Sequence, residues 1–220
     1  MIMPTETTVT ACPILTSDDK YMIIRRFINS IDMRTITDYI SDKILGFERY
    51  LDTIHNNSDF NNDPSHIPLG TYLRRVAKLS MPAGVHEDNS DFVYNSKMCI
   101  VYMYLYIQMF MKENVYLYKN TVCRVCFVGF MMAHKIIHDI PYNNRFFAAI
   151  SGTWGNPQVN RMEIEFMKML DWKICLSQND IISFIQKYNT DNMFLVVAIP
   201  TKNNTSENRH TIVDREVITN

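Results

Sequence analysis

Two cysteines and two histidines within one apolar stretch are the residues whose types and spacing are suited to binding a metal ion. Cys123 and Cys126 form a Cys-x-x-Cys pair, and His134 and His138 lie one helical turn apart, next to Asp139. A structural zinc site needs four ligands, and the sequence has no second cysteine pair at zinc-finger spacing. His-Lys-Ile-Ile-His also lacks the glutamate of the hydrolytic His-Glu-x-x-His helix. We therefore interpret the cysteines as core thiols and predict no metal and no cofactor; a metal-dependent enzyme that uses the two histidines remains an alternative.

No other catalytic motif is visible. The sequence contains no Gly-rich phosphate loop, Gly-x-Ser-x-Gly elbow or protein-kinase signature, and its carboxylates are scattered over polar faces. We therefore predict that the protein is not an enzyme. Lys135 and Glu163 stand out because each lies at the edge of a strongly apolar segment, where an isolated charge is costly unless it is paired. On spacing alone, two solvated charges at helix rims are the simpler interpretation.

The element that must position these residues is the segment Thr121–Asp139. It contains no proline, and its only internal charges are Arg124 and Lys135. A helix that is apolar on every side is buried on every side, and the segment is too long to be a strand. Gly129 and Ala133, one turn apart, are small enough to let a neighbouring helix approach. We predict that this segment is the central helix of an all-α domain.

Composition and charge argue against several classes of protein. The chain has 220 residues, 47% of them hydrophobic, with a net charge of −1 and a pI near 6.6. Such a charge provides no field that attracts nucleic acid or an anionic membrane, and we expect neither partner. The first residues lack a signal-peptide pattern, the apolar run Cys99–Met111 is too short to span a bilayer, and five cysteines favour reduced thiols. We expect the protein in the nucleus, the cytoplasm or both.

Periodicity and capping residues predict helices along most of the chain. Besides the central helix, they span residues 18–29, 35–54, 69–79, 94–111, 156–170 and about 178–188, with a short helix that is capped by Asn143 or Asn144 and ends at Ile150. We expect Ser17 to cap the first helix, Asn156 to cap the helix over 156–170 with Pro157 at its first position, and a Ser177–Asp180 capping box to begin the last. Residues 80–92 are predicted to be a loop and residues 193–199 a strand.

Six segments follow one another in the order and at the spacing of a known pattern. They are Ile67 with Tyr72–Val76, Cys99–Leu105, Thr121–Asp139, Tyr142–Asn144, Ala149–Gly152 and Val159–Trp172. The third tracks a family pattern similar to NVHRLLLTAVMVAAKFFDD without a gap. Together these segments resemble the cyclin box, and within the cyclins the P/U type, typified by the yeast phosphate-pathway cyclin. The resemblance covers about residues 67–190, and the predicted helix near 36–54 lies where that family has one.

The resemblance implies a fold and a binding site. The fold is all-α, a five-helix cyclin box around a buried central helix, with extra N-terminal helices. In cyclins the lysine of the central helix and the glutamate of the fifth helix bind the backbone of a kinase at the start of its C helix, and by position these are Lys135 and Glu163. The apolar interface residues around them are Ile136, Met167, Trp172 and Ile174. Glu163 and Met167 are also one helical turn apart, which places them on one face.

The resemblance further implies a function and its mechanism. A cyclin binds and activates a cyclin-dependent protein kinase, whose C helix must be positioned so that its glutamate pairs with the ATP-binding lysine. The cyclin surface binds the active arrangement better and shifts the population towards it, without performing chemistry itself. The alternative is a cyclin-fold adaptor or scaffold that activates no kinase, because a fold alone does not determine function. The near-neutral charge argues against a nucleic-acid-binding version of that adaptor.

The chain departs from the family pattern in several places. Tyr104 stands where the family usually has aspartate, and His134 replaces a small residue beside Lys135. The Met-Arg-Ala-Ile-Leu docking motif of the larger cell-cycle cyclins is absent, and no second cyclin repeat follows residue 190. We divide the chain into a flexible arm (1–16), an N-terminal helical extension (17–63), the cyclin box (64–190) and a tail that we expect to be largely disordered (191–220).

Overall fold

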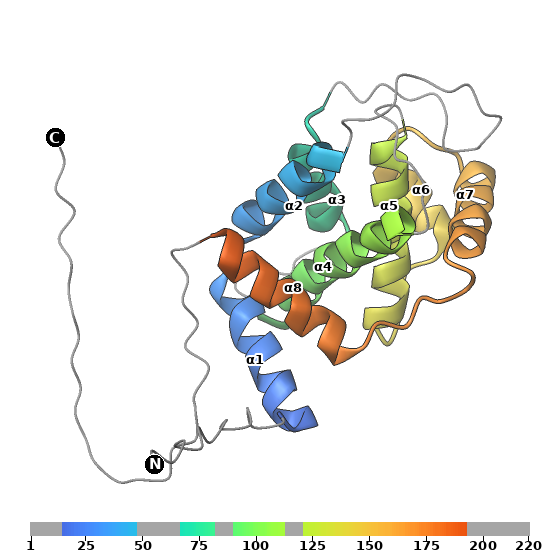
Figure 1. The fold of residues 1–220 in the computed structure, drawn as a ribbon. Coiled ribbons are helices and arrows are strands. Elements are labelled where there is room, and N and C mark those ends of the chain that lie inside the picture. The colour runs from blue at the N-terminus through green and yellow to red at the C-terminus, as the bar shows by residue number, and fades with distance from the viewer. Residues whose placement is uncertain (1–14, 48–66, 82–89, 113–120, 193–220) are drawn as a thin grey trace, which may run out of the picture.

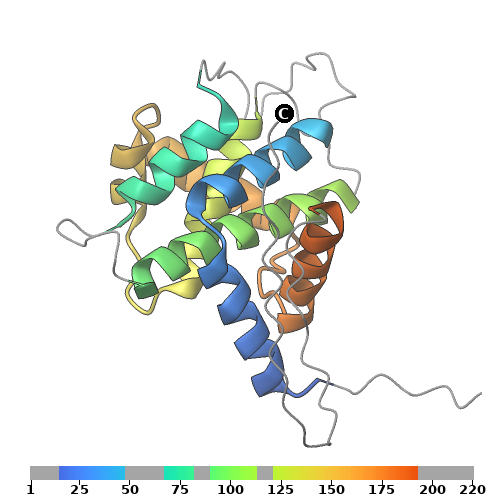
Figure 2. The ribbon, with the colours of Figure 1, turned by 90° about the vertical axis from the view of Figure 1, so that its left-hand side faces the viewer.

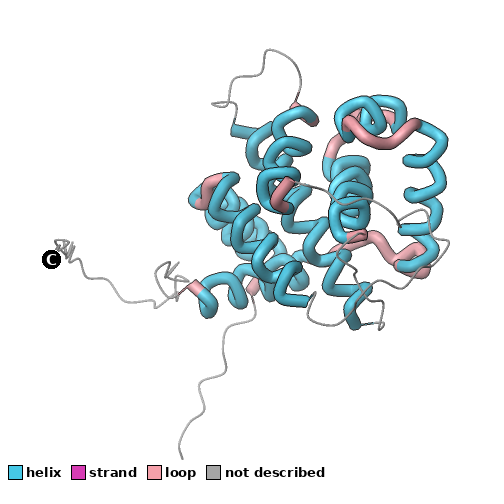
Figure 3. The backbone as a smooth tube through the Cα atoms, turned by 90° about the horizontal axis from the view of Figure 1, so that it is seen from above, coloured by secondary structure: helices cyan, strands magenta, loops and turns pink. Residues whose placement is uncertain are grey.

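The computed structural model describes residues 15–47, 67–81, 90–112 and 121–192, and in these ranges it contains helices and no strand. The helices are α1 (Ser17–Ser30), α2 (Met33–Phe47), α3 (Leu69–Leu79), α4 (Ser90–Lys112), α5 (Val122–Ile137), α6 (Asn144–Ser151), α7 (Asn156–Met169) and α8 (Gln178–Asp191) (Figure 1). The tube view shows helices joined by short connections throughout the described part of the chain (Figure 3). The predicted all-α fold is confirmed.

Helix α5 is the central helix that its composition predicts. Every residue from Val122 to His134 is buried, and α5 packs against α3, α4 and α7. Two neighbouring helices come close at Gly129, where an added Cβ atom would lie 3.1 Å from Cγ of Met103 in α4 and 3.3 Å from Cζ of Phe166 in α7. Cys123 and Cys126 are buried in this core, as predicted. The absence of a side chain at Gly129 thus allows α4 and α7 to close around the axis of the domain.

The two N-terminal helices pack directly on the same core. Helix α1 lies along α8, and α2 lies along α3, as the two ribbon views show from perpendicular directions (Figures 1 and 2). Phe27 of α1 meets Phe184 and Tyr188 of α8 edge-on, with ring centroids 6.3 Å and 5.2 Å apart. The buried Lys97 of α4 donates a hydrogen bond to the carbonyl of Ile28 at 3.1 Å. Burial lowers the pKa of Lys97.

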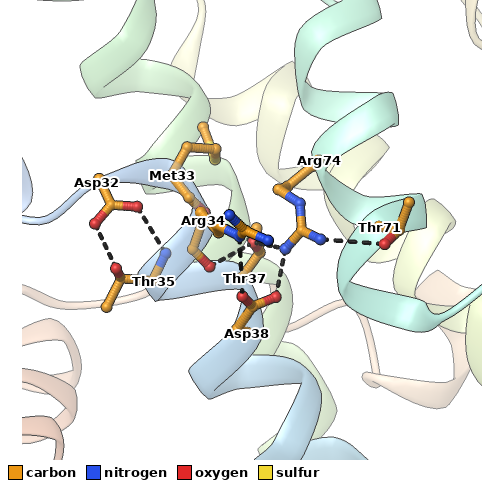
Figure 4. A network of polar contacts seen from close by, with 8 residues as sticks. All are labelled: Asp32, Met33, Arg34, Thr35, Thr37, Asp38, Thr71 and Arg74. Atoms are coloured by element: carbon orange, nitrogen blue, oxygen red, sulfur yellow. Dashed lines mark hydrogen bonds and ion pairs between the residues drawn. The ribbon is translucent and has the colours of Figure 1, made fainter.

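A polar network fastens α2 to α3 on the molecular surface (Figure 4). Arg74 of α3 forms an ion pair with Asp38 of α2 and donates hydrogen bonds to Thr37 and Thr71, each at 3.1 Å. The Asp32 carboxylate accepts from the backbone N–H of Thr35 at 2.8 Å and caps α2. A hydrogen bond from the Thr35 hydroxyl, together with the one from its backbone N–H, lowers the pKa of Asp32. Exposed ion pairs contribute at most about 1 kcal/mol each, so apolar packing carries most of this interface.

Several predicted helix ends are wrong by a few residues. The N-cap of α1 is Thr16 rather than Ser17, because Thr16 and Asp19 form a reciprocal capping box. Gly155, not Asn156, is the N-cap of α7, so Pro157 occupies the second helical position. Helix α4 begins at Ser90, four residues before the predicted start. The Ser177–Asp180 capping box and the Asn143 cap are confirmed, whereas the predicted strand 193–199 and residues 48–54 of the predicted second helix lie outside the described residues.

Tyr104 has a new environment in place of the usual acid. Its side chain is fully buried, and its ring packs edge-on against Phe184 of α8 at 5.7 Å. Its hydroxyl accepts a hydrogen bond from Gln108 at 3.0 Å. Burial raises the pKa of Tyr104 to about 12, so the phenol stays neutral. A neutral aromatic contact between α4 and α8 therefore stands where the family usually has a charged group.

Candidate functional site

The candidate site lies where α5 leaves the core. Burial on all sides ends at His134; Lys135 is half-buried, and the next residue, Ile136, is exposed. The chain then turns through Pro141 into α6, whose N-cap Asn143 accepts a hydrogen bond from the backbone N–H of Phe146 at 3.0 Å. This turn places the N-terminus of α6 and the middle of α7 beside the last turn of α5.

Lys135 and Glu163 form an ion pair there, joined by a third residue. The Lys135 ammonium lies 2.6 Å from Oε1 of Glu163 and donates to Oδ1 of Asn144 at 2.5 Å. Nδ2 of Asn144 donates to Oε2 of Glu163 and, at 2.7 Å, to Oδ1 of Asn160. The side chains of Lys135 and Glu163 are 23% and 22% exposed. The structure thus selects the paired state of these two charges over two separate solvated ones, and leaves both within reach of a partner.

Apolar side chains lie along the same helices. Ile136 and Trp172 are exposed, whereas Met167 and Ile174 are half-buried against the core. Met167 follows Glu163 by one turn of α7, as the spacing predicts, and its carbonyl accepts from the backbone N–H of Trp172 at 2.9 Å. The carbonyl of Ile174 accepts from Tyr106 of α4 at 2.9 Å. Glu163, Met167, Trp172 and Ile174 therefore follow one continuous path along α7 and its C-terminal turn.

Sequence reasoning missed three residues near this site in the chain. Ile140, in the turn after α5, is 90% exposed, and Ile164, which follows Glu163 in α7, is 50% exposed. Ile164 lies outside the buried stripe of α7, and an isoleucine outside that stripe was the available signal. Asn144 was assigned only to the helix cap, because no sequence rule says which of two adjacent asparagines caps and which is free to bind elsewhere.

The turn after α7 has an unusual backbone. Asp171 and Trp172 have φ angles of 49° and 61°, in the left-handed region that favours glycine. The N–H of Asp171 bonds to the carbonyl of Lys168 at 3.0 Å and that of Trp172 to Met167, which is the Schellman pattern of a helix C-terminus. Such conformations cost about 1–3 kcal/mol per non-glycine residue. The result is a tight turn that leaves Trp172 61% exposed.

The two histidines stack rather than converge. The rings of His134 and His138 lie 3.9 Å apart and nearly parallel, and Tyr142 stacks on the His134 ring at 5.3 Å. Because ring nitrogen lone pairs lie in the ring plane, stacked imidazoles cannot both point at one ion. Burial lowers the pKa of His134 to about 4, helped by His138. In the described part of the chain, no three His, Cys, Asp or Glu side chains are grouped to hold a metal.

Membrane insertion has no support from the described helices, since none combines the length and apolar character of a bilayer-spanning segment.

Comparison with known proteins gives the family. The family model of the cyclins matches residues 17–174, which includes every element of the site. The chain belongs to the cyclin family. Cyclins are regulatory proteins, and the family assignment agrees with the predicted cyclin box. The match also takes in α1 and α2, upstream of the segments that carried the resemblance.

Individual cyclins of the P and U types are similar to this chain. Cyclin-U1-1 of Arabidopsis thaliana is 27% identical over 142 residues, 64% of this chain and 59% of that protein. Cyclin-P1-1 of Oryza sativa subsp. japonica is 31% identical over 113 residues, 50% of this chain and 38% of that protein. Cyclin-U4-1 of Arabidopsis thaliana is 28% identical over 129 residues, 56% of this chain and 57% of that protein. These names confirm the P/U resemblance, and the chain matches only 38–59% of the length of the three relatives.

Proposed function

We propose that this cyclin binds a cyclin-dependent protein kinase and activates it by positioning the C helix of the kinase. The observation that carries the proposal is the Lys135–Glu163 ion pair, half-buried, next to exposed apolar residues of α5 and α7. An ion pair that only stabilised the fold would not need exposed isoleucine and tryptophan side chains around it. Exposed apolar side chains next to polar ones are typical of protein interaction surfaces.

The two charges match the free peptide groups at the start of a helix. The first turn of an α-helix has N–H groups without intrahelical partners and a partial positive charge. The Glu163 carboxylate accepts from such N–H groups, whereas the Lys135 ammonium donates to carbonyls of the preceding backbone. Ile136, Met167 and Trp172 then supply apolar contact area. Recognition of backbone at a helix start selects the position of that helix rather than its sequence.

Activation follows from differential binding. The C helix of an active kinase holds its glutamate against the ATP-binding lysine. A cyclin surface that fits the active position better than the inactive one raises its population by the ratio of the two affinities. The protein contributes position and no reacting group. We place this activity in the nucleus, the cytoplasm or both, and the net charge of −1 favours a protein partner over nucleic acid.

A pull-down tests the binding step. The tagged protein is recovered from its own cells beside a Lys135→Ala, Glu163→Ala double variant, and a histone kinase assay is run on each eluate. We expect the unaltered protein to bring down kinase activity and the double variant to bring down at least about tenfold less. The double variant loses the hydrogen bonds of both charged groups to the kinase backbone, and each hydrogen bond to a charged group contributes about 1.5–3 kcal/mol. A Lys43→Ala variant is the matched control, since it removes a 2.7 Å ion pair with Asp191 elsewhere on the molecule.

Two outcomes contradict the proposal. If the folded protein recovers no kinase, it does not bind one under these conditions, and the proposed binding step is wrong. If the double variant recovers as much kinase as the unaltered protein, the interface does not depend on Lys135 and Glu163. Either result favours a cyclin-fold adaptor.

A further inference from the structure

Asn144 makes contacts that go beyond helix capping. Its side-chain oxygen accepts from Lys135, and its nitrogen donates to Glu163 and Asn160. A lysine ammonium can only donate and a glutamate carboxylate can only accept. The charges on either side therefore fix which end of the amide faces which partner, and the Asn144 side chain has one orientation that satisfies both.

The three side chains form a closed ring that joins three helices. Lys135 lies in the last turn of α5, Asn144 is the first residue of α6, and Glu163 lies in the middle of α7. The backbone of Asn144 is itself anchored, because the adjacent Asn143 caps α6. Lysine and glutamate side chains have many rotamers and lose much entropy when they are fixed. The short, anchored amide holds both long side chains before any partner arrives.

The ring leaves binding capacity for a partner. The Lys135 ammonium has three N–H groups, and the bonds to Asn144 and Glu163 use two of them. Each Glu163 oxygen accepts one bond within the ring and retains a further lone pair. A partner backbone can therefore bind both groups without opening the ring, which keeps the cost of ordering the interface low.

We infer that Asn144 is a positioning residue that preorganises Lys135 and Glu163 for the backbone of the kinase partner. This inference rests on the proposed function, because it assigns a role within the same interface. Asn144 acts through the two charged residues rather than as an anchor of its own. Its loss leaves Lys135 and Glu163 joined only by their direct ion pair, so both side chains become less ordered and binding weakens while the fold persists.

The first test measures how firmly Lys135 is held in the free protein, with no kinase present. Limited acetylation with acetic anhydride, followed by mass spectrometry, gives the rate of modification of the Lys135 amine relative to that of the exposed Lys168 in the same molecule. We expect Asn144→Ala to raise this relative rate severalfold, and Asn160→Ala to leave it unchanged because the ring stays closed. An unchanged rate in Asn144→Ala overturns the inference whether or not a kinase binds.

The second test measures affinity for the kinase recovered with the unaltered protein. We expect Asn144→Ala to weaken binding about tenfold, because the partner must then order two side chains that only their direct ion pair restrains. Asn143→Ala, which removes the α6 cap but leaves the side chains of the ring, is the control for loss of α6 stability, and is expected to lose less affinity than Asn144→Ala at a temperature where it is folded. Affinity of Asn144→Ala equal to that of the unaltered protein overturns the inference, as does an equal loss in Asn143→Ala.

Asn144→Asp separates positioning from general packing. The new carboxylate still accepts from Lys135 but cannot donate to Glu163, which it repels. We expect slow acetylation of Lys135 together with weakened kinase binding, a combination that disruption of local structure does not produce. Rapid acetylation of Lys135 in this variant overturns the inference. If the unaltered protein recovers no kinase, the proposed function is contradicted. The acetylation rates still show whether Asn144 orders Lys135 and Glu163, because that test needs no kinase.

Discussion

Trp172 occupies a left-handed backbone conformation and keeps most of its side chain exposed to solvent. The capping hydrogen bond of Trp172 is made by its backbone N–H and persists in alanine, and truncating an exposed side chain that leaves such bonds in place changes stability by less than about 0.5 kcal/mol. Tryptophan is enriched among interface residues whose truncation costs 2 kcal/mol or more. We therefore expect Trp172→Ala to melt like the unaltered protein but to bind the kinase at least about tenfold more weakly.

The control for this prediction is Met22→Ala. Met22 is 63% exposed on α1, outside the proposed surface, so its truncation should change neither melting nor binding. Kinase titrations and thermal melts of the two variants show whether Trp172 contributes to binding rather than to stability. Equal binding by both variants would remove Trp172 from the interface.

His134 gives the stability a dependence on pH. Its pKa in the folded protein is about 4, below the ordinary value of 6.5, so between these values the unfolded chain binds more protons. Stability therefore falls as the pH is lowered through this window, by about 2 kcal/mol between pH 7 and pH 5 for this residue. Urea unfolding at the two pH values should show a smaller loss in His134→Phe, which keeps a ring in the stack. An equal loss in the variant would assign the effect to other groups.

The family resemblance supplied the positions of Lys135 and Glu163, but the sequence did not predict how they bond. Spacing alone did not distinguish an ion pair from two solvated charges, because pairing depends on how α5 and α7 cross. The left-handed turn at Asp171 and Trp172 carries no glycine that would signal it. The bridging role of Asn144 likewise depends on three helices at once.

At the scale of the helices, the close crossing at Gly129 sets the position of α5. Its Cβ position is crowded by Met103 and Phe166, so a valine there forces both neighbours out of place. Overpacking of this kind costs about 1–3 kcal/mol. We expect Gly129→Val to lower the free energy of unfolding in urea by that amount.

Gly46 provides the same substitution without the crowding. Nothing lies within 4 Å of a Cβ atom added there, and valine has a slightly higher helix propensity than glycine. Gly46→Val should therefore leave stability unchanged or raise it by a few tenths of a kcal/mol. A similar loss in both variants would mean that valine itself, rather than the helix crossing, destabilises the protein.

Helix existence was predictable and helix ends were less so. The segment Thr121–Asp139 was recognisable because it is apolar on every side and too long for a strand. At α1, Thr16 and Ser17 are both capping residues, and the choice depended on Asp19, which stands three residues after Thr16. At α4, Asp91 in the first turn is favourable at a helix N-terminus, a signal for the earlier start.

For the whole molecule, the question is whether α1 and α2 form an extension or part of the core. Phe27 of α1 is 1% exposed and packs against α8. Replacing a buried phenylalanine by alanine lowers the free energy of unfolding by about 3–5 kcal/mol. We expect Phe27→Ala to destabilise the entire protein in a single transition. Helix content by circular dichroism and the fluorescence of the tryptophans, which include the buried Trp154, should change at the same urea concentration.

Two separated transitions would contradict this expectation and would support the boundary that the sequence suggested at residue 63. The boundary was placed there because the resemblance began near residue 67. The packing of α1 on α8 joins residues more than 150 positions apart, and pairing over such a separation leaves no local sequence signal.

The most direct test of the central claim is the activity of the purified kinase partner as a function of added cyclin. The account predicts a saturable rise in the rate of peptide phosphorylation with the unaltered protein, and a curve shifted to at least about tenfold higher concentration with the Lys135→Ala, Glu163→Ala variant, which lacks both charged groups that bind the kinase backbone. A kinase that binds the unaltered protein with no change in its rate would contradict activation, and would make this cyclin an adaptor.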